Sequence, residues 1–186
     1  MEPLSVGVHS VFTQAKLQPA QSIVVFGCGP VGLLCMAVAK AIGASRIIAV
    51  DILQSRLDFA KKYAATDVFR PPPHQEGEPT TVYSQRAADI LRADLGVEDR
   101  GNKAIDVVID ASGAEVSIQT GILVAKVGGT FVQGSLASCQ LMSSLPDYRL
   151  AWVTQKWSYQ SLLCSQRSWS SKAPSAMACV LPAHVS

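Results

Sequence analysis

Residues 23–32 read Ile-Val-Val-Phe-Gly-Cys-Gly-Pro-Val-Gly, and they carry the strongest local signal for a particular fold. The short apolar run 23–26, rich in β-branched residues, is typical of a strand buried on both faces of a parallel sheet. Three glycines with G-x-G-x-x-G spacing follow it: Gly27, Gly29 and Gly32. Residues 31–42 are dense in apolar helix formers and end at Gly43. The pattern therefore predicts a strand, a tight glycine turn and a helix in direct succession.

Each position of the turn has a physical reason in a dinucleotide site. Gly27 permits the tight turn, Gly29 lets backbone amides approach a pyrophosphate, and Gly32 lets the helix pack close to the strand. Pro30 costs little at the first helical position, because the N–H it lacks would have no partner in the helix. The helix N-terminus, which includes Val31, offers unpaired N–H groups and a positive dipole end to a phosphate. The alternative is a glycine turn that holds no ligand.

Asp51 ends the next apolar run, residues 47–50, and lies 19 positions after Gly32. A carboxylate there accepts hydrogen bonds from the adenosine ribose hydroxyls and repels a 2′-phosphate, which favours NAD over NADP. Arg56 complicates this choice, because a guanidinium accommodates a 2′-phosphate. Its place inside the next helix favours packing over the adenine or contact with the ribose. The alternative for Asp51 is that it caps that helix.

The rest of the first 134 residues alternates between strand and helix patterns. Further strands are predicted at 47–50, 67–69, 105–110 and 130–133, and helices at 4–14, 56–65, 84–95 and 116–124. In helix 56–65 we expect four side chains to face inward: Leu57, Phe59, Ala60 and Tyr63. Residues 70–83 contain four prolines and are expected to form a surface loop or insertion. The alternation indicates an α/β fold with an incomplete Rossmann-type parallel sheet over residues 1–134.

Serine, glycine, cysteine and histidine residues outside the glycine turn are further candidates for site chemistry. Ser112 and Gly113 follow strand 105–110 at the carboxyl edge of the sheet, where they either line the cofactor cleft or form an ordinary strand-to-helix turn. Cys28 and Cys35 fit small apolar packing residues better than nucleophiles. The three histidines are scattered, without cysteines or carboxylates at metal-ligand spacing.

Composition divides the chain near Gly134. Residues 1–134 hold 13 acidic and 12 basic residues, a net charge of −1, whereas residues 135–186 hold one acidic and four basic residues, 12 serines and all three tryptophans. The overall charge of +2 is too balanced for a nucleic-acid or membrane-surface protein. No apolar run is long enough to span a bilayer, and the start lacks the pattern of a secretory signal. Five cysteines without framework spacing favour reduced thiols and a cytoplasmic location.

Five segments together resemble the zinc-containing medium-chain polyol dehydrogenases. They are residues 1–9, 24–34, 47–62, 110–113 and 128–134. Within this family the similarity is greatest to the fungal xylitol dehydrogenases (D-xylulose reductases) and next to the sorbitol dehydrogenases. The resemblance covers about residues 1–134.

The resemblance implies an NAD-dependent oxidoreductase that oxidises a sugar alcohol such as xylitol to a ketose, D-xylulose, while zinc polarises the alcohol. It places Val31, Asp51 and Arg56 against the pyrophosphate and adenosine end of NAD. It places Gly134 near the nicotinamide, and it matches Glu2 to a glutamate beside the zinc. The implied partners are NAD(H) and a polyol, in a possible homo-oligomer.

The family also has parts without a counterpart in this sequence. A GroES-like domain that supplies the zinc ligands precedes the segment that matches residues 1–4, so we expect that Glu2 alone does not hold the metal. Residues 135–186 do not follow the family pattern, and we expect a disordered or out-of-frame tail from a truncated gene product. Three functions stay open: a polyol dehydrogenase, a non-catalytic NAD-binding module, and a non-functional product.

Overall fold

The computed structural model describes residues 2–134 and 154–155. Its centre is one sheet with the strand order β3-β2-β1-β4-β5-β6. The strands are β1 (Ser22–Phe26), β2 (Arg46–Val50), β3 (Asp67–Phe69), β4 (Ile105–Asp110), β5 (Ala125–Gln133) and β6 (Thr154–Gln155). β1 to β5 are parallel, and the two-residue β6 pairs antiparallel with β5. The strand order reverses between β1 and β4, which is the switch point of a doubly wound sheet.

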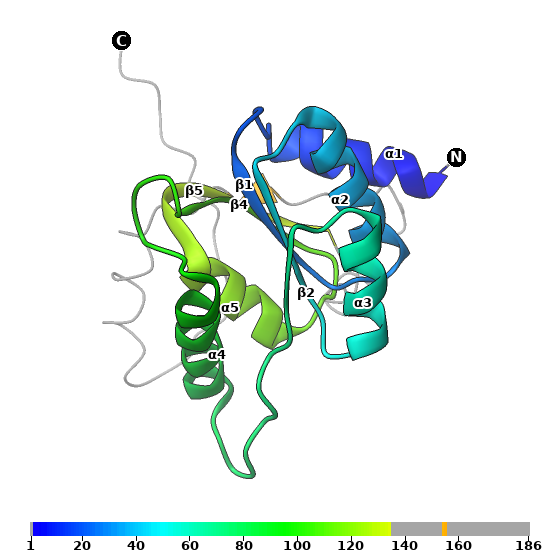
Figure 1. Cartoon of the computed structure of the whole chain (residues 1–186). Helices are drawn as coiled ribbons and strands as arrows, with labels where there is room; N and C mark the ends of the chain where they lie inside the picture. The colour runs from blue at the N-terminus through cyan, green and yellow to red at the C-terminus, as the bar shows by residue number, and fades with distance from the viewer. Residues whose placement is uncertain (1, 135–153, 156–186) are drawn as a thin grey trace, which may run out of the picture.

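Helices cover both faces of the sheet (Figure 1). One face carries α1 (Glu2–Val8), the π-helical turn η1 (His9–Gln14), α2 (Pro30–Ile42) and α3 (Gln54–Tyr63). The other face carries α4 (Thr80–Leu95) and α5 (Glu115–Val124), which pack against each other. Among the described residues, no helix is long and apolar enough to cross a membrane.

The alternation of side chains along β1 explains why its sequence is apolar throughout. Ile23 and Val25 belong to the core beneath η1 and α2, whereas Val24 and Phe26 belong to the core beneath α4 and α5. All four are 2% exposed or less. A strand covered on both sides has no polar face, so its sequence reads as a continuous hydrophobic run. The expected Rossmann-type α/β fold is confirmed.

The expectation for the inner face of α3 is half wrong. Leu57 and Ala60 are buried, but Phe59 is 54% exposed and Tyr63 is 44% exposed. At 100° per residue, positions 59 and 63 lie about 200° and 240° around the helix from position 57, on its outer side. The two rings stack on each other with centroids 5.8 Å apart. They therefore shield one another rather than the core.

Helix α4 begins at Thr80, four residues earlier than predicted, so the proline-containing loop is shorter than residues 70–83. Pro79 is the N-cap residue, with an extended backbone. The Tyr83 hydroxyl donates to the carbonyl oxygen of Pro72 at 2.7 Å, and Tyr83 is buried. Residues 80–83 show no helical repeat of apolar residues, and the contact of Tyr83 with the loop orders this first turn of α4.

Strand β5 is longer than the predicted 130–133, because it contains a bulge. Ala125 pairs with Ile105 and Thr130 pairs with Val107, so four residues of β5 lie opposite one residue of β4. Gly128 has a φ of +78° within this bulge. The prediction covered only the regularly paired part of the strand. The expectation of an irregular tail over 135–186 lies outside the described residues, apart from β6.

Candidate cofactor site

The glycine turn lies between β1 and α2 at the switch point. Gly27 has a φ of +92°, in the left-handed region that residues with a side chain rarely adopt. A Cβ atom at Gly32 would lie 1.8 Å from the carbonyl oxygen of Gly27, so only glycine lets α2 approach the turn this closely. The Gly27 N–H donates to the carbonyl oxygen of Val50 at 2.7 Å, which ties the turn to the end of β2.

Gly29 has a different geometry, with an ordinary φ of −75°. No atom lies within 4 Å of a Cβ built on it, so the space in front of the turn is open. Gly29 is the N-cap of α2, no side chain caps the helix there, and Pro30 opens it. The first-turn N–H groups, including that of Val31, lack intrahelical partners and form the positive end of the helix dipole. An open cradle beside these groups fits a pyrophosphate.

Asp51 follows β2 directly, and its carboxylate reaches the glycine turn. Oδ2 accepts a hydrogen bond from the Cys28 N–H at 2.8 Å, and Oδ1 accepts one from the Leu53 N–H at 2.9 Å. A carboxylate has about four acceptor positions, so two remain for ribose hydroxyls. Asp51 does not cap α3, because the N-cap is Leu53 and no side chain caps that helix. The helix-capping alternative is therefore wrong.

Arg56 extends the charged part of the site. Its Nη1 lies 3.8 Å from Asp51 Oδ2, and its side chain is 54% exposed against 5% for Asp51. The guanidinium is therefore available to a ligand that reaches Asp51. The Cys28 thiol, by contrast, is buried and does not face a ligand. Burial, with a contribution from Asp51, raises the pKa of this thiol to about 12. Cys28 and Cys35 are both buried free thiols, in line with the expected packing role.

The loop after β4 meets the glycine turn. Ser112 and Gly113 are held by the carboxylate of Asp110, which is fully buried. The Ala111 N–H donates to the carbonyl oxygen of Phe26 at 2.8 Å. On the other side, the Gly134 N–H donates to the carbonyl oxygen of Asp110 at 2.7 Å. The structure thus brings Ser112, Gly113 and Gly134 to the same sheet edge as the glycine turn.

The sequence reasoning missed Asp110 as a member of this site. The sequence predicts contact with the cofactor only for Ser112 and Gly113 of the segment Asp-Ala-Ser-Gly. The signal that could have found it is the Asp-x-Ser-Gly pattern directly after a strand. An aspartate side chain commonly accepts hydrogen bonds from the N–H groups two residues further on.

Zinc does not fit the described residues. Within residues 2–134 and 154–155, no group of three or more His, Cys, Asp or Glu side chains could hold a metal ion. Glu2, the residue matched to a glutamate beside zinc, opens α1. Its proximity to a metal stays a prediction.

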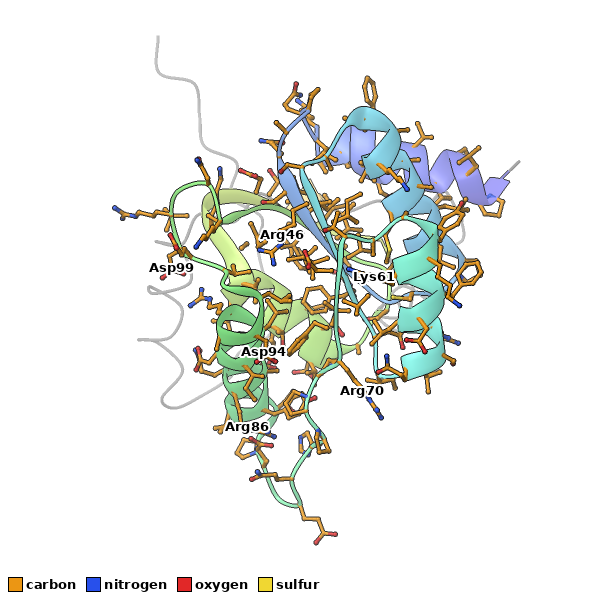
Figure 2. The ribbon with its side chains drawn as sticks, in the orientation of Figure 1. Arg46, Lys61, Arg70, Arg86, Asp94 and Asp99 are labelled. Atoms are coloured by element: carbon orange, nitrogen blue, oxygen red, sulfur yellow. The ribbon has the colours of Figure 1, made fainter. Side chains whose placement is uncertain are left out.

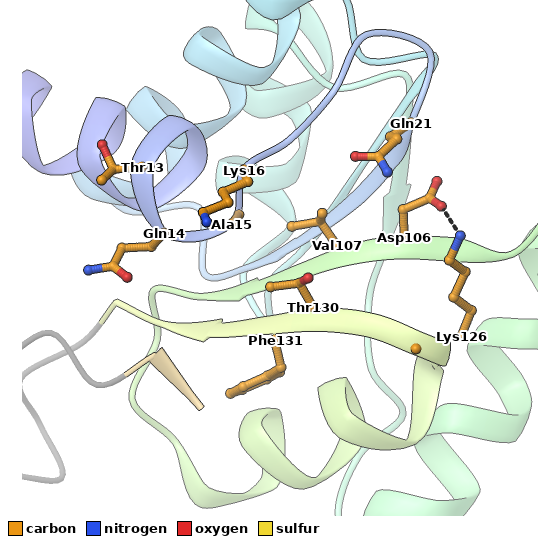
Figure 3. Close-up of a pocket in the computed structure, with 11 residues that line it drawn as sticks. Thr13, Gln14, Ala15, Lys16, Gln21, Asp106, Val107, Lys126, Thr130 and Phe131 are labelled. Carbon is orange, nitrogen blue, oxygen red and sulfur yellow. Dashed lines mark hydrogen bonds and ion pairs between the residues drawn. The ribbon is translucent and has the colours of Figure 1, made fainter. Parts of the chain in front are cut away.

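A separate hollow of about 590 Å³ lies at the opposite, amino edge of the sheet (Figure 3). It is bounded by η1 and by the starts of β4 and β5, with Gln14, Lys16 and Thr130 among its lining residues. Lys126 pairs there with Asp106. The Rossmann rule places ligands at the carboxyl ends of the strands, so this hollow lies on the wrong edge for a dinucleotide.

Together, the doubly wound sheet and the glycine turn at its switch point define a Rossmann-type domain, the class that binds nucleotides at the carboxyl edge of the sheet. Comparison with known families goes one step further. Residues 30–177 match the model of the zinc-binding dehydrogenase family, and the chain belongs to this family.

Individual relatives agree with this assignment. The chain is 56% identical over 144 residues to a protein named probable D-xylulose reductase A from Aspergillus fumigatus, a match that covers 76% of this chain and 36% of the relative. The D-xylulose reductase A of Aspergillus niger is 55% identical over 141 residues, with the same coverage. The solved structure of 2R,3R-butanediol dehydrogenase from Bacillus subtilis superposes with a TM-score of 0.55 at 26% identity, covering 71% of this chain and 33% of that one. The chain spans about a third of the length of these relatives.

Proposed function

We propose that this chain binds NAD(H) at the carboxyl edge of its sheet, as the cofactor-binding part of a polyol dehydrogenase. The intact enzyme of this type would oxidise a sugar alcohol such as xylitol to a ketose such as D-xylulose. The observation that carries the proposal is the open space at Gly29 beside the uncapped N-terminus of α2, with the Asp51 carboxylate next to it. The names of the Aspergillus relatives support the substrate class. We place the protein in the cytoplasm, in line with its thiol composition.

The residues take distinct roles in this proposal. The turn residues and the first-turn amides bind the pyrophosphate, Asp51 accepts from the ribose hydroxyls, and Arg56 lies against the adenosine end. The loop after β4 and the end of β5 line the rest of the cleft. The proposed contact residues are Gly27, Gly29, Pro30, Val31, Gly32, Asp51, Arg56, Ser112, Gly113 and Gly134. When bound, the nicotinamide supplies the hydride acceptor, and the protein supplies its binding and orientation.

Asp51 also gives the proposed site a preference for NAD over NADP. Its side chain is held between Cys28 and Leu53, so it cannot swing away from a 2′-phosphate, and two negative groups would face each other. Arg56 offsets this repulsion only in part, because its charge is mostly exposed to water. We therefore expect the Kd for NADPH to exceed the Kd for NADH by about a hundredfold, which corresponds to about 2.7 kcal/mol.

Titration of the purified full chain with NADH, followed by cofactor fluorescence, tests the proposal. The Gly29→Ala variant places a methyl group in the pyrophosphate position at an ordinary φ, and we expect it to raise the Kd about tenfold or more. The control is Gln85→Ala on the exposed side of α4, where the side chain bonds only to Asp89 on the same helix. The proposal fails if the unmodified chain does not bind NADH, or if Gly29→Ala binds as well as the control.

Two other functions give different results in the same assays. A non-catalytic NAD-binding module binds NADH and shows no xylitol-dependent formation of NADH. A non-functional product aggregates or does not bind. Because the described residues lack a set of zinc ligands, we expect binding without turnover from this chain alone. Xylitol-dependent NADH formation above background would contradict that expectation.

A further inference from the structure

Asp110 is the last residue of β4, and its carboxylate lies beneath the candidate cofactor site with no exposed surface. Oδ1 accepts hydrogen bonds from the Ser112 N–H at 3.1 Å and from the Ser112 hydroxyl at 2.7 Å. Oδ2 accepts from the Gly113 N–H at 3.2 Å. The Ser112 oxygen in turn accepts from the Ala114 N–H at 3.3 Å, at the start of α5. One carboxylate therefore fixes the whole connection between β4 and α5.

This connection touches the glycine turn directly. A Cβ at Gly27 would lie 3.0 Å from the Ser112 nitrogen and 3.1 Å from the Ala111 carbonyl carbon. The Ala111 N–H also donates to the carbonyl oxygen of Phe26, the residue before the turn. The backbones of the two loops are therefore in contact, and a shift of residues 111–113 would move the turn that faces the pyrophosphate.

We propose that Asp110 is a positioning residue for the dinucleotide, an inference that rests on the proposed NAD-binding function. The Asp110 side chain accepts several hydrogen bonds from residues 112–113 at once, so it holds the backbone of 111–113 against the glycine turn before the cofactor arrives. A loop that is already ordered does not have to be ordered by the ligand, and this preserves affinity. All the loop groups that Asp110 binds lie at the carboxyl edge of the sheet, where the cofactor would lie.

The test compares the same change, aspartate to asparagine, in two variants, one at each end of β4. Asp110→Asn leaves one acceptor oxygen and turns the other into an N–H₂ donor that faces the Gly113 N–H. We expect the Kd for NADH to rise about tenfold at a temperature well below unfolding. The matched control is Asp106→Asn, at the amino edge of β4, where the carboxylate accepts from the Ser22 N–H at 2.8 Å and pairs with Lys126. Asp106→Asn should lower Tm and leave the Kd unchanged.

A double-mutant cycle separates positioning from general stability. Ser112→Ala removes the 2.7 Å hydrogen bond that the hydroxyl donates to Asp110 and the 3.3 Å hydrogen bond that it accepts from the Ala114 N–H, and we expect it to raise the Kd about threefold. If both residues act through the same loop, Asp110→Asn/Ser112→Ala binds no more weakly than Asp110→Asn. If Asp110→Asn does not fold, Ser112→Ala decides, with amide hydrogen exchange of residues 111–114 in the cofactor-free chain as a second measurement. A raised Kd together with faster exchange supports the inference. An unchanged Kd, or a raised Kd with unchanged exchange, overturns it, because Ser112 would then act by direct contact with the cofactor.

Failure of this inference differs from failure of the proposed function. If the unmodified chain binds NADH but Asp110→Asn binds equally well, Asp110 has no positioning role. The same conclusion follows if Asp106→Asn weakens binding as much as Asp110→Asn, or if the cycle is fully additive. If the unmodified chain does not bind NADH, both the proposed function and the inference fall.

Discussion

At the scale of single residues, the glycines of the turn divide into one that serves packing and one that serves access. Gly32 is a packing glycine, because a Cβ there would lie 1.8 Å from a backbone oxygen that belongs to the turn itself. Gly29 is an access glycine, because its Cβ would meet nothing. Glycine is therefore needed at the two positions for different reasons, close packing at Gly32 and open space at Gly29. Single alanine substitutions distinguish these two reasons.

Gly32→Ala should destabilise the fold. The clash is with the carbonyl oxygen of Gly27, which cannot rotate away as a side chain would, so α2 must move from the sheet. We expect the free energy of unfolding to fall by about 1–3 kcal/mol, as for overpacked cores. Urea denaturation measures this, with Gly29→Ala as the control, for which we expect a smaller fall of under about 1 kcal/mol, because alanine is only a poorer N-cap than glycine. Equal unfolding midpoints for the two variants would contradict the packing role of Gly32.

The two buried cysteines should be unreactive in the folded chain. Burial raises the pKa of Cys28 and of Cys35 to about 12, so roughly one thiol in ten thousand is ionised at pH 8. After brief iodoacetamide treatment of the folded chain, mass spectrometry of the peptides that contain Cys28 and Cys35 should find them unmodified. The same peptides should be alkylated after unfolding in guanidinium. Rapid alkylation without denaturant would show that α2 opens readily or that the thiols are not buried.

At the scale of elements, the loop between β3 and α4 is tied down by the helix that follows it. Arg86 lies on α4 beside the loop (Figure 2). It donates to both carboxylate oxygens of Glu78 at 2.9 and 2.7 Å and to the carbonyl oxygen of Pro73 at 3.1 Å. Its guanidinium also lies 5.3 Å from the centre of the Tyr83 ring. The loop therefore has a defined path that its prolines alone would not specify.

Removal of this tie should release the loop and leave the sheet intact. We expect Arg86→Ala to be cleaved several times faster within residues 70–79 by a protease of broad specificity, because local opening of the loop costs less free energy. Gln85→Ala is the matched control, since Gln85 lies next to Arg86 on α4 but bonds only to Asp89 on the same helix. Equal cleavage of the two variants would mean that Arg86 does not hold the loop.

The elements that could be predicted from sequence are those whose signal is local. Strands such as Ile23–Phe26 are covered on both faces, so burial leaves a continuous apolar run that needs no knowledge of neighbours. The start of α4 was missed because Tyr83 is buried by a distant loop, through its hydrogen bond to Pro72. Phe59 was placed inside on its apolarity alone, although its angular position on α3 relative to Leu57 already put it outside.

For the site, the same distinction between local and distant signals holds. Gly27, Gly29, Gly32 and Asp51 could be proposed from spacing, because the motif, the strand before it and the helix after it are contiguous in sequence. The Asp-x-Ser-Gly pattern indicates that Asp110 bonds to its own loop, but the contact of that loop with the glycine turn could not be predicted, since it depends on the pairing of β4 with β1, which brings Asp110 opposite Phe26. That register places two loops separated by about eighty residues in backbone contact.

At the scale of the whole molecule, the two edges of the sheet differ in how their charges are used. At the carboxyl edge, Asp51 and Asp110 accept mainly from backbone N–H groups and so shape the turns. Elsewhere, carboxylates bond to cationic side chains: Asp106 to Lys126 at the amino edge, and Asp67 to Arg46 at 2.8 Å between β2 and the start of β3. We infer that the ion pairs at these two sites secure the sheet, while the carboxyl edge is left open for a ligand.

These ion pairs make the stability of the fold depend on pH in the acid range. Burial alone would raise the pKa of Asp106, but hydrogen bonds from Lys126 and Ser22 outweigh it and hold the pKa below its ordinary value. The same balance, with Arg46 and Thr66 as donors, lowers the pKa of Asp67. An unfolded aspartate titrates near a pKa of about 3.9, so the folded state binds fewer protons than the unfolded state in this range. The contribution is therefore complete above about pH 5 and is lost as the pH falls through the folded pKa values.

Thermal unfolding between pH 7 and pH 2.5 measures this dependence. We expect the Tm of the unmodified chain to be nearly constant down to about pH 5 and to fall steeply below pH 4. Asp106→Asn should unfold about 3 °C lower at pH 7, and the two curves should converge at low pH, where the protonated aspartate resembles asparagine. Glu76→Gln, in the exposed loop before α4, should follow the unmodified chain throughout. A constant difference between Asp106→Asn and the unmodified chain down to pH 2.5 would show that the ionised carboxylate of Asp106 does not stabilise the fold.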